Sequence, residues 1–153
     1  MAKTFIDYRE DIGFWVAEIY MELTYEYVLQ ALNSIEDDLS IREELIEDIE
    51  FNINGLARGM LTLTWYSFLK NEEQLNEIDL VLNNAKNLLL DKGEYILVEE
   101  LNKYEVKKKE MASKWPKPIK TSEVIKIVEA LILMLNDEWY EPNYSMNIDY
   151  SFL

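Results

Sequence analysis

The chain has 153 residues, 30 of them acidic and 15 basic, a net charge of −15, and neither cysteine nor histidine. Without cysteine, disulfides, thiol nucleophiles and cysteine-based metal sites are excluded. Without histidine, the commonest general base and the commonest transition-metal ligand are missing. A surface this acidic repels nucleic-acid phosphates and anionic lipids, so we expect neither nucleic acid nor a membrane as a direct partner.

The length fits one domain spanning residues 1–153. With 4 Gly and 3 Pro in the chain, few residues break helices. We therefore predict an all-α fold, a compact bundle of about five to six helices with a short extended C-terminal tail as the place for any minor β structure. Charge appears early in the N-terminal segment, and the longest apolar run, Ala130 to Leu135, is too short to span a membrane. These features predict a soluble, cytoplasmic protein.

The first predicted helix runs from Asp7 to about Asn33, because apolar residues recur at helical spacing. They are Ile12, Val16, Ile19, Leu23 and Tyr27. The pattern Ser40-x-x-Glu43 predicts a capping box that opens a second helix. Residues 60–69 are apolar on nearly all sides, and for this segment we favour a buried helix over a strand.

Asn71 and Gln74 predict the start of the most regular helix in the chain, and Gly93 predicts its end. Two more helices are predicted, from about Glu94 to Met111 and from Thr121 or Ser122 to about Tyr140. Residues 144–152 alternate between apolar and polar side chains, which is typical of a half-buried strand. We expect this tail to pack within the protein; the alternative is that it adds to the edge of a partner's sheet.

The negative charge is concentrated near the N-terminus. Residues 1–55 contain 14 acids and 3 bases, whereas residues 101–120 contain 2 acids and 7 bases. The densest acidic run is opposed locally by Arg42 alone, and it comprises Glu36, Asp37, Asp38, Glu43, Glu44, Glu47, Asp48 and Glu50. Like charges at helical spacing repel, so the run costs folding energy, which is an indication of a binding role; the alternative is an acidic, merely solvated face.

We predict that this run docks a basic protein partner. The first helix adds an acidic stripe, Glu18, Glu22 and Glu26, and Tyr25 lies within that stripe. Acids and tyrosines together can hold Lys and Arg by ion pairing and by cation–π contacts. The lysines at 107–109, beside Trp115, are interpreted as a solvated helix end and not as a nucleic-acid patch.

One alternative is a magnesium-dependent hydrolase. Pairs such as Glu44-x-x-Glu47 resemble the first acidic motif of the all-α nucleotide pyrophosphohydrolases. That family needs a second Glu-x-x-Asp pair on a later helix, and here Glu73 is followed three residues later by Asn76. The chain is therefore assigned to no family on this ground.

The function predicted from sequence is an acidic, non-catalytic inhibitor of the immunity-protein or nuclease-blocking kind. Such proteins are often small and acidic, and they act as nucleic-acid mimics that occlude a basic active site or cleft; the likeness is one of size and charge. We expect a toxin or nuclease as partner, no cofactor, no metal, and a monomer or weak dimer. The hydrolase and a non-catalytic assembly subunit remain the alternatives.

Overall fold

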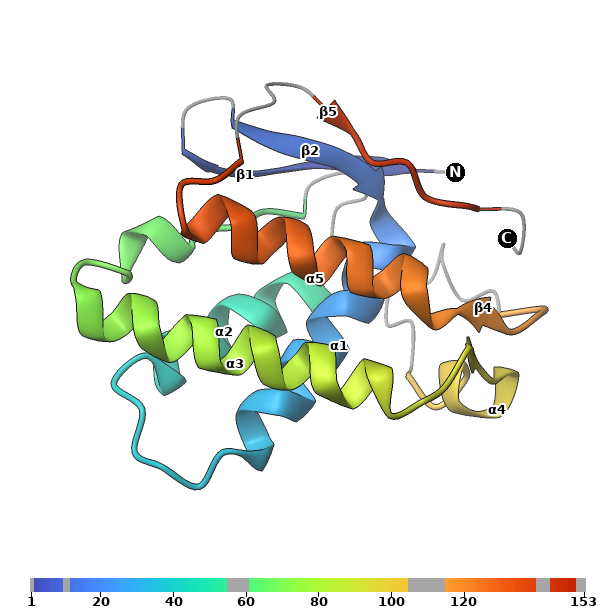
Figure 1. The fold of residues 1–153 in the computed structure, drawn as a ribbon, viewed down its shortest axis with the longest axis horizontal. Coiled ribbons are helices and arrows are strands. Elements are labelled where there is room, and N and C mark those ends of the chain that lie inside the picture. Colours follow the sequence, from blue (N-terminus) through green and yellow to red (C-terminus); the bar gives the residue numbers. More distant parts are fainter. Residues whose placement is uncertain (1, 10–11, 55–60, 105–114, 140–143, 151–153) are drawn as a thin grey trace.

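The computed structural model describes residues 2–9, 12–54, 61–104, 115–139 and 144–150. A small β-sheet lies along one side of a set of helices (Figure 1). In chain order the elements are β1 (Lys3–Arg9), β2 (Ile12–Ala17), α1 (Glu18–Ser34), α2 (Arg42–Ile53), the 3-10 turn η1 (Trp65–Ser67), α3 (Glu72–Leu90), β3 (Tyr95–Ile96), α4 (Val98–Leu101), β4 (Ile119–Lys120), α5 (Thr121–Leu135) and β5 (Tyr144–Ser145). The prediction of an all-α bundle is therefore wrong, because the fold is mixed α/β.

The largest departure from the predicted fold is the N-terminal hairpin. Residues 7–17 were expected to begin a long helix, but β1 and β2 pair antiparallel there, with Ile6 opposite Phe14. Thr4, Ile6 and Tyr8 alternate inward along β1, which is the period of a half-buried strand. The helix begins only at Glu18.

Gly13 allows the two strands of the hairpin to approach closely. A Cβ atom at this position would lie 2.1 Å from the carbonyl oxygen of Ile6. Any larger residue would therefore push the strands apart.

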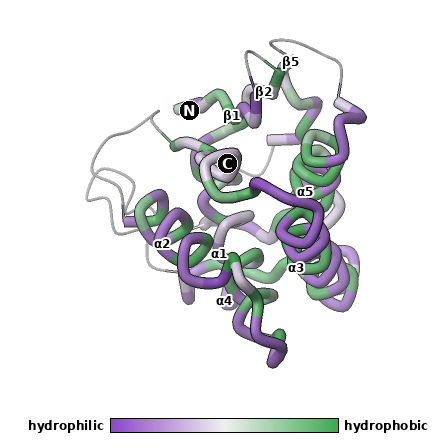
Figure 2. Tube along the Cα trace, turned by 90° about the vertical axis from the view of Figure 1, so that its left-hand side faces the viewer, coloured by the Kyte–Doolittle hydropathy of each residue, from purple (hydrophilic) through white to green (hydrophobic). Residues whose placement is uncertain are grey.

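Helix α1 is the centre of the fold. It packs against α2, α3 and α5, and β2 leads directly into it. Figure 2 shows the sheet on one side of this helical layer, with α3 and α5 beside each other. Because neighbours surround α1 on most sides, polar residues such as Glu18 and Thr24 are buried along with its apolar ones.

The C-terminal tail packs within the protein as far as residue 150, as expected, while residues 151 and 152 lie outside the described residues. β5 runs parallel to β2, with Trp15 opposite Ser145. The Asp149 N–H donates to a carboxylate oxygen of Glu123 at 3.0 Å. The tail thus completes the three-stranded sheet in the order β1-β2-β5.

The segment between α2 and α3 is neither of the two structures considered for it. Residues 61–64 have no regular structure and lead into η1, while residue 60 lies outside the described residues. The predicted cap of α3 is confirmed, because the Asn71 side chain accepts a hydrogen bond from Gln74 N at 2.9 Å. Gly93 follows the end of α3 with a positive φ of 85°.

Other predicted boundaries differ. The helix expected at 94–111 is replaced by β3 and α4 as far as residue 104, and residues 105–111 lie outside the described part. α5 ends at Leu135, before the predicted Tyr140. The Ser40 capping box does not form, because the Ser40 hydroxyl donates to Glu77 instead. Within the described residues, no helix is long and apolar enough to cross a membrane.

Candidate protein-binding face

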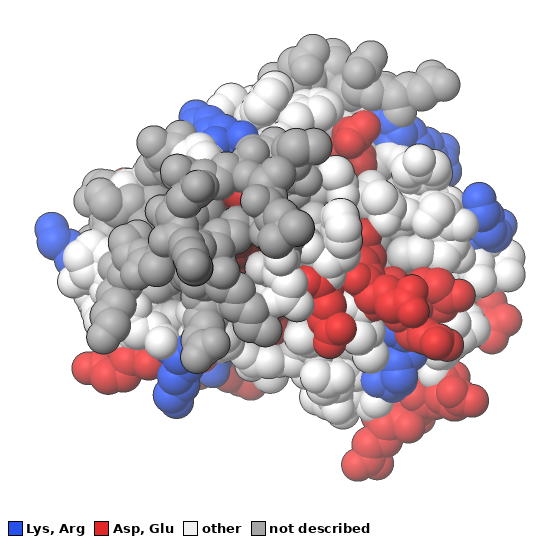
Figure 3. Space-filling model, turned by 180° about the vertical axis from the view of Figure 1, so that it is seen from behind, with Lys and Arg blue, Asp and Glu red and all other residues white. Residues whose placement is uncertain are grey.

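The exposed carboxylates gather on α2 and on the loop before it. Leu45, Ile49 and Ile53 are buried on one side of α2, which turns the other side toward solvent. We call the acidic face the seven exposed acids Glu36, Asp37, Asp38, Glu43, Glu44, Glu47 and Glu50. Figure 3 shows acidic side chains concentrated on this side of the molecule.

Within the described residues, Arg42 forms no ion pair with the carboxylates of the acidic face. Its guanidinium donates to the carbonyl oxygens of Leu32 at 2.9 Å, Ile35 at 2.7 Å and Asp37 at 2.9 Å. These carbonyls lie at or just after the C-terminal end of α1, where a cation is favourable and where the helix has no basic residue of its own. The nearest base in sequence is thus committed to capping α1.

Within the described residues, no other base forms an ion pair with the acidic face. The ion pairs formed among the described residues join Arg9 to Asp137, Lys86 to Glu129, Lys92 to Glu100 and Lys126 to Glu123. None of these pairs includes an acid of the acidic face. In the described part of the chain, its carboxylates therefore have no cation bound to them as an ion pair.

The first turn of α3 extends the acidic surface. Ser40 N donates to a carboxylate oxygen of Glu77 at 2.7 Å, which fixes the loop before α2 against α3. Glu73 lies one helical turn before Glu77 and is exposed, as is Glu72. Sequence reasoning missed this neighbourhood because Ser40 and Glu77 are 37 residues apart.

Tyr25 and Asp48, both predicted for docking, are buried and structural. Tyr25 is fully buried, and its hydroxyl donates to the carbonyl of Thr62 at 2.5 Å. Asp48 is 8% exposed, and its carboxylate accepts hydrogen bonds from the Thr64 hydroxyl and from Trp65 Nε1. Both residues therefore hold segment 61–65 in place and do not face a partner.

Burial also changes the chemistry of these two groups. Desolvation raises the pKa of Asp48 above its usual value, although the hydrogen bonds from Thr64 and Trp65 oppose that rise. Desolvation likewise raises the pKa of the Tyr25 hydroxyl, and the nearby Asp48 charge adds to the effect.

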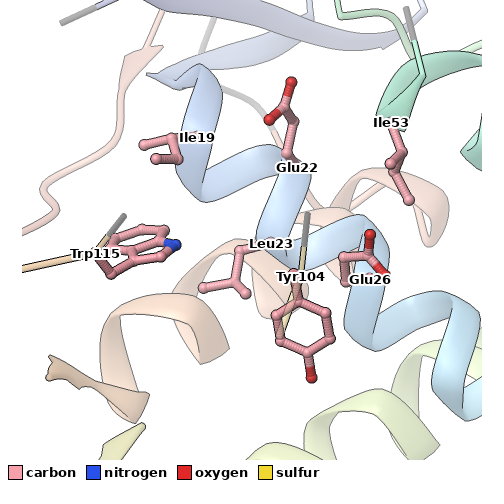
Figure 4. Close-up of a pocket in the computed structure, with 7 residues that line it drawn as sticks. All are labelled: Ile19, Glu22, Leu23, Glu26, Ile53, Tyr104 and Trp115. Carbon is pink, nitrogen blue, oxygen red and sulfur yellow. The ribbon is translucent and has the colours of Figure 1, made fainter. Parts of the chain in front are cut away.

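The acidic stripe of the first helix is separate from the acidic face. Glu18 is fully buried, Glu22 is 9% exposed and Glu26 is half-buried. Glu22 and Glu26 line a small cavity together with Ile19, Leu23, Ile53, Tyr104 and Trp115 (Figure 4). The cavity measures about 20 Å³, enough for about one or two water molecules and far less than a nucleotide needs.

The residues that the sequence predicted to bind a partner therefore fall into two groups, one exposed and one buried. The structure brings the acids of 36–50 together on one face, except for Asp48. Glu18, Glu22, Glu26 and Tyr25 lie inside or at the edge of the core.

The hydrolase alternative gains no support from the geometry. Glu44 and Glu47 are exposed on α2, and the described residues contain no group of three or more Asp, Glu, His or Cys side chains that could hold a metal ion. No family model, curated protein or solved structure matches the chain. Function must therefore be inferred from the arrangement of its side chains.

Proposed function

We propose that the protein is an inhibitor that binds another protein, and that its acidic face covers a basic active site or nucleic-acid-binding cleft. One observation supports this most directly. Seven carboxylates are exposed on α2 and its leading loop, while the guanidinium of Arg42, the base within that run, is hydrogen-bonded to carbonyl oxygens at the end of α1. In a complex, these carboxylates take the places that nucleic-acid phosphates would occupy on the target.

The energetics of α2 favour a partner. Glu43 and Glu47 are four residues apart, and Glu47 and Glu50 three, so their charges repel by a few tenths of a kcal/mol per pair. A basic surface relieves this repulsion when it docks. It also attracts the inhibitor from a distance, which speeds association at low salt.

An exposed aromatic side chain supplies an apolar contact within the same face. Phe51 is 69% exposed and follows Glu47 by one turn of α2. Protein interfaces combine aromatic anchors with polar rims. Phe51 beside the carboxylate of Glu47 matches a basic target that also offers an apolar depression.

The test compares two variants that lose the same amount of charge. The face variant carries Glu43→Gln, Glu44→Gln, Glu47→Gln and Glu50→Gln. The matched control carries Asp91→Asn, Glu94→Gln, Glu99→Gln and Glu138→Gln, which are exposed acids outside the face. Each protein, immobilised, captures partners from an extract of the source cells, and mass spectrometry identifies them.

The captured partner is then purified, and its binding and cleavage of nucleic acid are measured with each inhibitor. We expect wild type and control to block a basic nucleic-acid enzyme, and the face variant to lose this effect. The association rate should fall steeply as salt rises. Equal inhibition by the face variant, or an affinity that does not change with salt, would show that the acidic face is not the binding surface.

A further inference from the structure

Among the described residues, no strand pairs with the side of β1 that faces away from β2. Glu18 N donates to the carbonyl of Ala2 at 2.8 Å, which continues the ladder between β1 and β2. Backbone groups alternate in direction along a strand of an antiparallel pair. Thr4 and Ile6 therefore point their N–H and C=O groups toward β2, and Lys3, Phe5 and Asp7 point theirs away from it.

The two edges of the sheet differ. On the far side of β2, Met146 N donates to the carbonyl of Trp15 at 3.0 Å, and Ala17 N donates to the Tyr150 hydroxyl at 3.0 Å. On the β1 side, the described residues supply no hydrogen bond to the outward backbone groups of the strand. Figure 2 shows β1 at the margin of the sheet, with β5 at the other side of β2.

The side chains of Lys3, Phe5 and Asp7 on β1 are complementary to the same three side chains of a second copy. Lys3, Phe5 and Asp7 alternate with buried residues, so they share the outer face of the sheet. If a second β1 runs antiparallel with Phe5 opposite Phe5, each Lys3 lies opposite the Asp7 of the other copy. Opposite charges directly across two strands are favourable, as are paired aromatic rings.

We propose that a second copy of this chain pairs along β1 in this register and forms a two-fold symmetric dimer with a continuous sheet. Three residue pairs with two backbone bonds each give about six hydrogen bonds across the join. Phe5 already packs on Trp15 with ring centroids 5.2 Å apart, and Trp15 is 38% exposed. Pairing of two β1 strands therefore also brings aromatic side chains of the two copies together. The acidic face takes no part in this contact.

Two features limit the strength of the dimer. The regular register ends at the irregularity between Asp7 and Arg9, so the paired segment is short. The net charge of −15 on each copy opposes association. The dimer is therefore weak and depends on protein concentration.

Charge exchange tests the register directly. Sedimentation equilibrium over a concentration series, at about 0.15 M ionic strength, gives the dimer dissociation constant. Lys3→Asp or Asp7→Lys alone places like charges opposite each other twice, and we expect each to weaken the dimer about tenfold or more. An equimolar mixture of these two variants restores association, because every facing pair is then of opposite charge.

Controls separate self-pairing from other causes. Lys103→Asp and Glu99→Lys make the same charge changes at exposed positions on or beside α4 and should leave the dissociation constant unchanged. Phe5→Pro removes an outward N–H that β2 does not use, and it should abolish the dimer while thermal unfolding shows the fold intact.

Two results would overturn the inference. One is a wild-type protein that remains monomeric throughout the concentration series. The other is a dimer whose dissociation constant is the same in wild type, both single variants and their mixture. Because the acidic-face variant keeps β1 intact and carries less negative charge, it must dimerise at least as tightly as wild type, so this test is independent of the proposed inhibitor function.

Discussion

Asp48 follows Glu47 on α2, but its carboxylate is buried and bonded to Thr64 and Trp65. Glu47 belongs to an exposed charged surface, whereas Asp48 anchors a neighbouring segment. A buried carboxylate is held in place at the cost of desolvation, and this cost raises its pKa. Two adjacent residues of α2 therefore differ, because Glu47 is exposed to solvent and Asp48 is a buried structural group.

The raised pKa of Asp48 predicts how stability changes with pH. Because the pKa is higher in the folded state than its ordinary 3.8, the folded protein binds more protons in the interval above that value. Stability from this group is complete below the unfolded pKa and is lost as pH rises through the folded one. We expect the unfolding free energy of wild type, relative to Asp48→Asn, to decrease across this interval.

Urea unfolding of both proteins at a series of pH values measures this difference. Asp48→Asn keeps the size of the side chain and removes its titration. A difference that increases with pH, or does not change, would contradict a raised pKa at this position.

At the scale of elements, the hairpin depends on the close approach of its two strands at Gly13. A methyl group there would meet backbone atoms of Ile6 and Asp7. Backbone cannot move aside as easily as the end of a flexible side chain. The pairing of β1 with β2 therefore requires glycine at position 13.

We predict that Gly13→Ala destabilises the protein by about 1–3 kcal/mol, because the strands must separate to admit the methyl group. Chemical denaturation measures the change. Ile12→Ala is the matched control on the same strand, since Ile12 is 37% exposed, and it should change stability by about 0.5 kcal/mol or less. Equal effects of the two substitutions would contradict the close strand contact.

Local pattern predicted α3 well and the hairpin badly, for identifiable reasons. The cap at Asn71 and the regular apolar stripe act within a few residues, so sequence alone places α3. The apolar residues of β2 happen to continue the helical spacing of α1, so one helix was expected across both. Residues 12–17 form a strand because they pair with β1, as Phe14 does with Ile6. The helical spacing of apolar residues within one segment does not reveal such a pairing.

The candidate site divides in the same way. The acids of 36–50 could be predicted from their density along the chain. The burial of Asp48 depends on the approach of Trp65, and the contact of Ser40 with Glu77 depends on the packing of α3. Both require the tertiary structure.

At the scale of the whole molecule, charge and stability work against each other. The chain carries a net charge of −15, and the acidic face concentrates part of it on α2 and its leading loop. Self-repulsion of this kind lowers the stability of the folded state. A protein whose acids serve a partner should therefore gain stability when some of them are neutralised.

We predict that the double substitution Glu47→Gln and Glu50→Gln stabilises the free protein by about 1 kcal/mol at low salt, since it removes the repulsion of Glu47 with Glu43, Glu44 and Glu50. The two acids in the first turn are kept because they favour the helix dipole. Thermal unfolding at low salt and at about 1 M salt checks this, and the gain should vanish when charges are screened. A loss of stability at low salt would mean that these acids support the fold.

The polar contacts around segment 61–65 also affect the order of folding. Thr4 bonds to the carbonyl of Leu61 across 57 positions, and Tyr25 bonds to that of Thr62 across 37. Asn52 accepts from Thr62 N at 2.8 Å. Closing such long loops lowers the chain entropy before the contacts that they allow can form. Segment 61–65 can become ordered only after the hairpin, α1 and α2 have packed together. Its amide protons should therefore be among the last to become protected during refolding.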